Sequence, residues 1–227
     1  MVPRVTPLLA AHDVALAYAG RAVLDACSIE IAPGEALVLS GENGSGKTTL
    51  LRVLAGLERP DAGRLWFDGA PIEAGSFPRA VRRALQYVPT HPYLFSTSVR
   101  ANLDYGLRAH RIDPDERRRR TNAAIEWARL QPVVDTPPQQ LSAGEKQRIA
   151  TARAWVLAPR VVLFDEPTSN LDRASRAQVV ALISELCAGH TAVLIVAHDR
   201  ELIELAGARR LNLAHGRVQA PDAHAEN

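Results

Sequence analysis

The chain has 227 residues, of which 47% are hydrophobic, and its 27 Lys+Arg against 25 Asp+Glu give a formal net charge of +2 at pH 7. This length and composition are enough for one domain with a buried core, so they exclude a disordered chain. The balanced charge excludes the dense basic patch that bulk nucleic-acid binding requires, so no nucleic-acid partner is expected.

Cysteine usage and apolar runs narrow the class of protein further. Cys27 and Cys187 lie far apart and in no metal-ligand spacing, so neither a disulfide scaffold nor a zinc site is expected. The longest apolar runs are much shorter than a membrane span, and residues 1–20 lack the run of a signal peptide. We therefore expect a soluble or peripheral protein in a reducing compartment.

The N-terminal segment predicts antiparallel strands. Apolar residues alternate with other residues at Val14, Leu16 and Tyr18, and turn signals follow at Gly20 and at Pro33-Gly34.

A strand, a glycine-rich loop and a helix are predicted next. Residues 35–40, EALVLS, are an apolar run typical of a buried strand, and TLLRVLAGL at 49–57 places its apolar residues on one helical face. The sequence between them is a complete GxxxxGK[ST] motif in the strand-to-helix context that this motif needs. The residues predicted to bind nucleotide phosphates are Gly41, Glu42, Asn43, Gly44, Ser45, Gly46, Lys47, Thr48 and Thr49.

Each residue type in this loop has a role toward a polyphosphate. Glycines let the backbone N–H groups wrap the phosphates, and the start of the helix attracts anionic oxygens. Lys47 reaches the β and γ phosphates, and the hydroxyl of Thr48 holds Mg²⁺. The run VVLFDE supplies the carboxylates of this site: Asp165 binds the metal through water, and Glu166 orients a water that attacks the γ phosphate.

The order of the remaining elements predicts an α/β fold. ALQYV, VVLFDE and TAVLIVAHD are short apolar runs typical of interior parallel strands, and helical stretches separate them. Between about 90 and 140 the pattern is helical without strong strand candidates, and a short polar tail follows Arg217. The four arginines at 117–120 follow acidic residues at helix spacing, which is typical of a solvated helix face. We expect a P-loop NTPase (RecA-like) core with an N-terminal antiparallel β subdomain and an inserted helical subdomain.

One further motif narrows the class of NTPase. Residues 141–145, LSAGE, followed by the basic stretch KQRIATARA, resemble the LSGGQ signature of the ATP-binding cassette (ABC) ATPases. The resemblance covers nearly the whole chain and implies that 1–227 is a single ABC ATPase domain. It also implies a homodimer with ATP sandwiched between the chains, in which Ser142, Gly144 and Glu145 close over the nucleotide of the second copy.

Other landmarks of that family occur in the expected order. By resemblance, Tyr18 stacks on adenine, and Gln86 in the glutamine loop senses Mg²⁺ and the attacking water. Residues 169–172, SNLD, resemble the D-loop at the dimer interface, and His198 resembles the switch histidine that contacts the γ phosphate. Since no catalytic landmark is missing, the resemblance implies an active ATPase.

Two residues depart from the usual signature. Ala143 replaces a glycine and Glu145 replaces a glutamine. Ala143 is tolerated if its φ is negative, whereas Gly144 could not be replaced cheaply if its φ is positive.

The resemblance leaves several kinds of ABC protein open. The chain is expected to be the ATPase subunit that powers a separate transmembrane permease, peripheral on the cytoplasmic side of the cell membrane. Alternatives are a soluble ABC ATPase acting on ribosomes, DNA or iron-sulfur assembly, and the cassette of an exporter. Soluble translation factors of the family usually carry two cassettes, and its DNA-repair members carry a long coiled coil; this sequence has neither. A small-molecule kinase is disfavoured because it needs neither LSAGE nor His198.

The segment 91–99, with Asn102 after it, bears on cargo and partner. It resembles the corresponding region of importers for phosphate and for tungstate or molybdate, which implies import of a small oxyanion with a solute-binding protein. Tyr93, Leu94 and Phe95 are predicted to line an exposed groove for a cytoplasmic helix of the permease. The alternative is that they pack in the core of the helical insertion itself.

Overall fold

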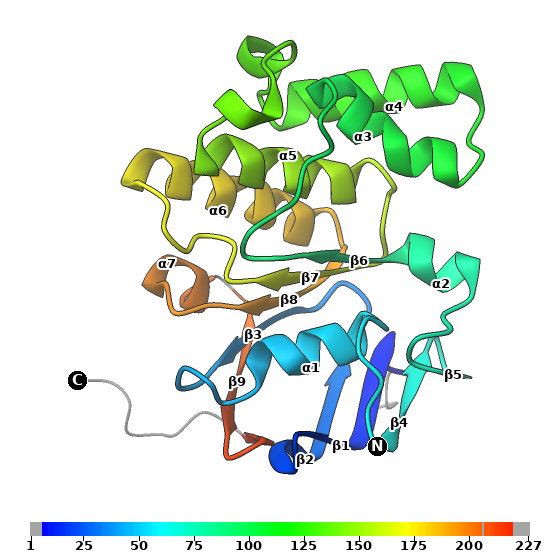
Figure 1. The fold of residues 1–227 in the computed structure, drawn as a ribbon, viewed down its shortest axis with the longest axis vertical. Helices are drawn as coiled ribbons and strands as arrows, with labels where there is room; N and C mark the ends of the chain where they lie inside the picture. Colours follow the sequence, from blue (N-terminus) through cyan, green and yellow to red (C-terminus); the bar gives the residue numbers. More distant parts are fainter. Residues whose placement is uncertain (1–5, 206, 220–227) are drawn as a thin grey trace.

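Two sheets of different kinds lie on either side of the helix that follows the glycine-rich loop (Figure 1). The computed structural model describes residues 6–205 and 207–219. The smaller sheet is antiparallel, in the order β2-β1-β4-β5, which confirms the N-terminal prediction. Its strands are β1 (Leu9–Tyr18), β2 (Arg21–Ile31), β4 (Ala62–Phe67) and β5 (Ala70–Ile72). Gly20, with φ at 80°, makes the tight turn between β1 and β2.

The larger sheet has the order β10-β9-β3-β8-β7-β6. All its pairings are parallel except that of β10 with β9, so the predicted parallel sheet is confirmed. Its strands are β3 (Ala36–Ser40), β6 (Leu85–Val88), β7 (Val161–Asp165), β8 (Ala192–Val196), β9 (Arg209–Ala214) and β10 (Arg217–Gln219). β7 and β8 are buried along their whole length, as the continuous apolar runs predicted.

Helices cover both faces of the larger sheet. On one face α1 (Lys47–Leu54) packs between this sheet and the smaller one, in a core that includes Leu50, Leu163 and Leu194. The opposite face is covered by α5 (Ala143–Trp155) and α6 (Arg173–Ala188), around the buried ring of Phe164. Two short helices, α2 (Arg79–Ala84) and α7 (Arg200–Ile203), flank the sheet.

The segment between β6 and α5 is helical, as predicted, and it forms the upper part of the molecule in Figure 1. It contains α3 (Val99–Ala109), α4 (Pro114–Trp127) and the 3₁₀ turns η1 (Gln131–Val133) and η2 (Pro138–Gln140). Ser98 and Asp113 cap the two α-helices by accepting backbone N–H groups of the first turn. Together with α5 these helices enclose a separate apolar core.

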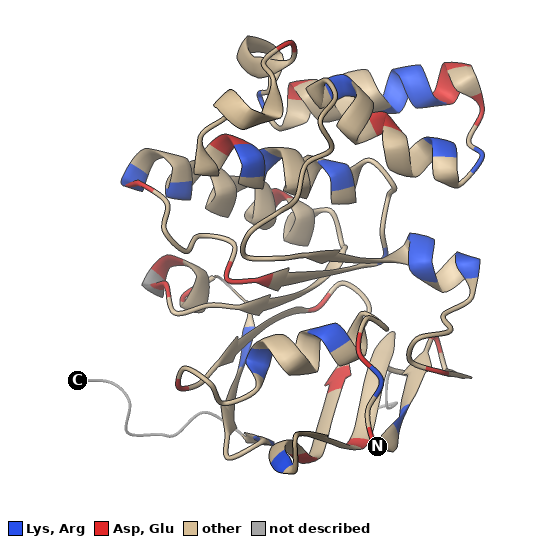
Figure 2. Cartoon of the chain, viewed as in Figure 1, with Lys and Arg blue, Asp and Glu red and all other residues tan. Residues whose placement is uncertain are grey.

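Ion pairs account for the arginine run on α4. Arg118 pairs with Asp115 at 3.0 Å, and Arg120 pairs with Glu116 at 2.6 Å, one helical turn apart. The predicted solvated helix face is therefore confirmed only in part (Figure 2): Arg118 and Arg119 are exposed, whereas the side chains of Arg117 and Arg120 are each 29% exposed.

The apolar groove predicted around Leu94 is only partly correct. Leu94 is 8% exposed and belongs to the core of the helical insertion, whereas Tyr93 is 70% exposed. Fully buried Asn102 causes this arrangement, because its side chain accepts from Phe95 N at 2.8 Å and donates to Phe95 O at 3.0 Å. This double bond to the backbone holds the segment so that Leu94 turns inward.

No helix within residues 6–205 and 207–219 is long and apolar enough to cross a membrane. Most of the polar tail predicted after Arg217 lies outside the described residues.

Candidate nucleotide-binding site

The glycine-rich loop joins the carboxyl end of β3 to the start of α1. Gly46 occupies the N-cap of α1 with φ at 105°, a left-handed conformation that side chains rarely adopt. A Cβ atom there would also lie 2.9 Å from the carbonyl oxygen of Val23. The helix therefore begins directly at Lys47, and the N–H groups of its first turn are directed at the loop.

Lys47 is buried and lies among carbonyl and carboxylate groups. Its Nζ donates to the carbonyl oxygens of Gly41 and Glu42, each at 2.8 Å. Burial lowers the pKa of the Lys47 ammonium, and the charges of Glu166 and Asp165 oppose that shift. The ammonium therefore stands where anionic oxygens could replace the two carbonyl groups.

The buried hydroxyl of Ser45 indicates that the loop can bind phosphates. Its Oγ is buried and has no hydrogen-bond partner among the described residues. A buried hydroxyl without a partner costs free energy unless a ligand satisfies it. An orphan donor, a buried ammonium and a helix start in one loop suit a polyphosphate.

Asp165 ends β7 and is 2% exposed. Its Oδ1 accepts from the hydroxyl of Thr48 at 3.0 Å, and its Oδ2 accepts from the hydroxyl of Tyr87 at 2.9 Å. Burial, with the neighbouring charge of Asp165, raises the pKa of Tyr87 to about 12, so this hydroxyl remains a donor. A hydroxyl and a carboxylate beside a phosphate loop are the oxygen ligands that suit Mg²⁺.

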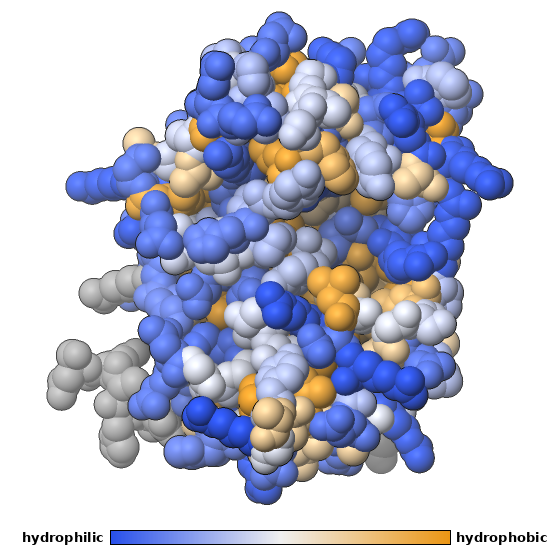
Figure 3. All heavy atoms as spheres, in the orientation of Figure 1, coloured by the Kyte–Doolittle hydropathy of each residue, from blue (hydrophilic) through white to orange (hydrophobic). Residues whose placement is uncertain are grey.

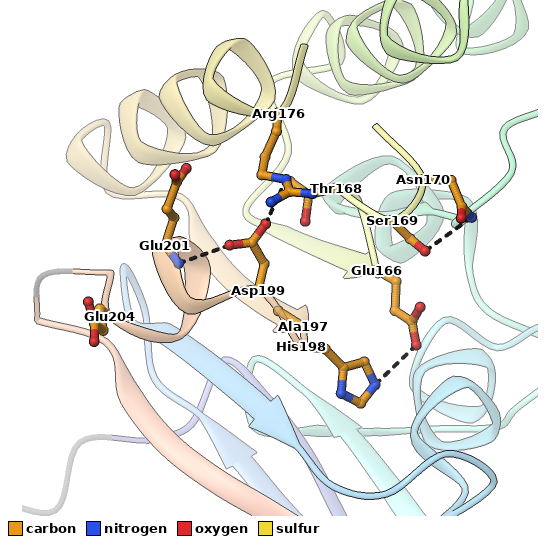
Figure 4. A pocket seen from close by; sticks show the side chains of 10 residues that line it. All are labelled: Glu166, Thr168, Ser169, Asn170, Arg176, Ala197, His198, Asp199, Glu201 and Glu204. Atoms are coloured by element: carbon orange, nitrogen blue, oxygen red, sulfur yellow. Dashed lines mark hydrogen bonds and ion pairs between the residues drawn. The ribbon is translucent and has the colours of Figure 1, made fainter. Parts of the chain in front are cut away.

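Glu166 follows Asp165 but faces a different space. Its φ of 47° is left-handed, which turns its carboxylate toward His198 at the end of β8. Nε2 of His198 lies 3.4 Å from Oε1 of Glu166, and Figure 4 shows the two side chains pointing toward each other. They line a pocket of about 600 Å³ whose opposite side includes Asp199 and Arg176.

Comparison with known proteins identifies the family. A family model described as "ABC transporter" matches residues 24–169. The chain belongs to the ABC transporter family. Like other members, it is an ATP-binding cassette ATPase.

Individual relatives support the same assignment. The chain is 36% identical to the cell division ATP-binding protein FtsE of Escherichia coli (strain K12), over 94% of this chain and 98% of FtsE. It is 39% identical to the sn-glycerol-3-phosphate import ATP-binding protein UgpC of Bartonella quintana (strain Toulouse), over 80% of this chain. The matched region spans about half of UgpC, 52% of its length.

A solved structure has the same fold. The ATP-binding cassette MJ0796, solved as a dimer in a post-hydrolysis state with ADP and Pi, superimposes with a TM-score of 0.83. The two chains are 26% identical, and the match covers 94% of this chain and 97% of that one.

The ABC signature begins α5 and is closed by a capping box. The Oγ of Ser142 accepts from the backbone N of Glu145 at 3.2 Å and donates to its carboxylate at 2.9 Å. The same carboxylate accepts from the backbone N of Ser142 at 2.7 Å. Both hydrogen-bonding capacities of the signature serine are therefore used within its own helix turn.

Gly144 is required by close packing and not by its backbone angle. Gly144 lies inside α5 and is absent from the described glycines with positive φ. A Cβ at this position would overlap the side chain of Ser175 on α6. This close contact with Ser175 explains why position 144 is a glycine. The neighbouring Ala143 is exposed, so its methyl group is accommodated.

The D-loop connects β7 to α6. Asn170 is left-handed with φ at 60°, and Asp172 caps α6 by accepting from Ser175 N at 2.9 Å. Asn170 and Ser169 both line the pocket next to Glu166.

The predicted role of Gln86 is wrong. Gln86 pairs with Val162 on β7, three residues before Asp165, and so lies toward the opposite end of the strand. Its Nε2 donates to the carbonyl oxygen of Arg82 at 2.7 Å, at the end of α2. The joint with the helical insertion begins only after Val88, and residues 89–98 contain no glutamine.

Tyr87 is the β6 residue that reaches the site, and the sequence analysis missed it. The signal was available, because side chains alternate along a strand and Gln86 and Tyr87 must face opposite sides. Tyr18 ends β1 with 43% of its surface exposed, so its ring is accessible, and its stacking on adenine remains a prediction.

Proposed function

We propose that the chain is an ATP-hydrolysing subunit that dimerises on MgATP and powers solute transport through a separate membrane permease. The convergence of Lys47, Asp165 and Glu166 at the carboxyl end of a parallel sheet supports this proposal. An ammonium, a hydroxyl paired with a carboxylate and a second carboxylate are the groups that phosphoryl transfer to water requires.

Each residue has a distinct task in this mechanism. Lys47 exchanges its two carbonyl partners for phosphate oxygens, and Ser45 donates its free hydroxyl to the same anion. The hydroxyl of Thr48, and Asp165 through water, would hold Mg²⁺, which would neutralise charge on the phosphates. Glu166 accepts the proton of the attacking water, and His198 contacts the γ phosphate while orienting the Glu166 carboxylate.

The second copy supplies the signature. Ser142 and Glu145 are bonded to each other within one chain, and the pocket beside Glu166 is open. We place Ser142, Gly144 and Glu145 of the partner copy over the ATP held by Lys47 of the first. Hydrolysis then requires a dimer, and its rate rises faster than linearly with protein concentration.

An exposed aromatic cluster on the helical insertion is the proposed docking surface for the permease. Phe95 lies between Tyr93 and Tyr105, with ring centroids 5.8 and 4.4 Å apart, and Arg153 lies over the Phe95 ring at 5.9 Å. Tyr93 and Tyr105 are exposed. The face drawn in Figure 3 is mostly hydrophilic with several separate apolar patches, some of them at the level of the helical insertion. An aromatic surface of this kind suits a short cytoplasmic helix.

The cargo proposed is a small oxyanion, imported with a solute-binding protein, with the cassette on the cytoplasmic side of the cell membrane. The resemblance of residues 91–99 to oxyanion importers supports it, and so does the name of UgpC, a protein for sn-glycerol-3-phosphate import. A second candidate follows from FtsE, which the chain matches along nearly its full length. In that case the ATPase serves cell division.

One purification tests whether the partner is a membrane permease. The tagged chain is isolated from detergent-solubilised membranes of its own organism, and the partners are identified. We expect a membrane-spanning permease that wild type retains and that Tyr93→Asp loses, while both variants hydrolyse ATP. Retention of a ribosome or DNA-repair complex instead would contradict the proposal.

A further inference from the structure

Tyr87 lies on the edge strand β6, next to the buried carboxylate of Asp165. It is the third residue of β6 and pairs with Leu163 of β7, two residues before Asp165. Its ring packs against the apolar core on the α1 face of the sheet. Its hydroxyl donates to Oδ2 of Asp165 at 2.9 Å.

The two oxygens of Asp165 therefore have separate fixed partners. Thr48 bonds Oδ1 at 3.0 Å and Tyr87 bonds Oδ2 at 2.9 Å, from different elements on either side of the carboxylate. A carboxylate held at both oxygens cannot rotate freely about its terminal bond. Asp165 is also almost fully buried, so water does not compete readily for these positions.

Thr48 and Tyr87 differ in what happens when a cation binds. Thr48 would offer a lone pair of its hydroxyl oxygen to the metal as a ligand, and its proton can stay on Asp165. The bond from Tyr87 lies on the far oxygen and can persist. Gln86, the neighbouring β6 side chain, is bonded to the end of α2 and takes no part.

We propose that Tyr87 is a positioning residue that presets the Asp165 carboxylate for Mg²⁺. This inference rests on the proposed MgATP function. Outer partners of a metal-binding carboxylate tune metal affinity without touching the metal. Tyr87 therefore controls how much Mg²⁺ strengthens nucleotide binding and leaves the phosphate loop unchanged.

The test measures binding of a fluorescent ATP analogue to the full chain, in EDTA and in excess Mg²⁺. Tyr87→Phe keeps the ring and removes the hydroxyl. We expect unchanged affinity in EDTA and a gain from Mg²⁺ that is smaller by about tenfold. Tyr105→Phe, at an exposed side chain of α3, is the matched control and should behave as wild type.

The outcomes separate this inference from the function on which it rests. If wild type binds the analogue equally with and without Mg²⁺, the proposed MgATP site fails and the inference fails with it. If wild type gains from Mg²⁺ and Tyr87→Phe gains as much, the inference alone is overturned. Equal weakening in EDTA and in Mg²⁺, with a lower melting temperature, would show that Tyr87 only stabilises the fold, and this also overturns it.

Discussion

Nε2 of His198 lies 3.4 Å from Oε1 of Glu166, across the carboxyl ends of the neighbouring strands β8 and β7. The left-handed backbone of Glu166 sends its carboxylate to this contact, while the preceding Asp165 faces Thr48. The two adjacent acidic residues at the end of β7 therefore face two different sites. Glu166 and His198 can contact a water molecule in the pocket, and the buried Asp165 can bind a metal ion.

Replacing the proposed base should stop hydrolysis and preserve binding. Glu166→Gln keeps the shape of the side chain but cannot accept a proton, so the turnover rate should fall about 100-fold or more. ATP should then hold the chain as a dimer that elutes early in size-exclusion chromatography. A monomeric variant with wild-type turnover would assign the base to another residue.

The glutamate of the signature should weaken the ATP-bound dimer. Its carboxylate accepts from Ser142 at 2.9 Å and adds negative charge where the partner's phosphate is expected. Glu145→Gln removes that charge and should tighten the ATP-dependent dimer by about 1 kcal/mol, or roughly fivefold in dissociation constant. Analytical ultracentrifugation measures the constant. Because the acid also favours the start of α5, unfolding free energy should fall by about 0.5 kcal/mol. A weaker dimer would show that the carboxylate itself is needed.

Leu94 and Tyr93 are neighbours with opposite expected effects. Leu94→Asp places a charge in the core of the helical insertion and should lower the free energy of unfolding by about 3 kcal/mol. Tyr93→Asp, at a side chain 70% exposed, should leave stability within about 0.5 kcal/mol. Urea denaturation measures the free energy of unfolding of both variants. Equal losses for the two variants would contradict the described packing.

Acid should destabilise the junction between α2 and α3. Burial first, and then the charges of Arg79, Arg83 and Arg82, lower the pKa of His110 below its ordinary value. The unfolded chain therefore binds this proton more readily, so the stability from neutral His110 is present above about pH 6.5 and is lost as pH falls. His110→Gln should lose less unfolding free energy than wild type between about pH 7.5 and 5.5 in urea titrations. An identical pH dependence would exclude His110 as the source.

The sequence was sufficient wherever a local pattern determines the structure. The phosphate loop needs only residues 41–48 between a strand and a helix, and the buried strands follow from continuous apolar runs. The directions in which side chains point were harder to predict from the sequence. Gln86 marked the region of the joint, but strand alternation turns it away and presents Tyr87. Leu94 stands between two aromatic residues in the sequence, a pattern that suggested a surface groove. Only the hydrogen bonds of the Asn102 side chain to the backbone of Phe95 show why Leu94 is buried.

Mixing two variants tests the shared site most directly. Lys47→Ala lacks the phosphate contact but keeps the signature, and Ser142→Arg keeps Lys47 but blocks the signature. Each alone should have almost no ATPase activity. In a mixed dimer, Lys47 of one chain meets Ser142 of the other, so one complete site forms and the mixture should regain ATPase activity well above the sum of the separate variants. A mixture no more active than that sum, or a Ser142→Arg chain as active as wild type, would contradict a site built from two chains.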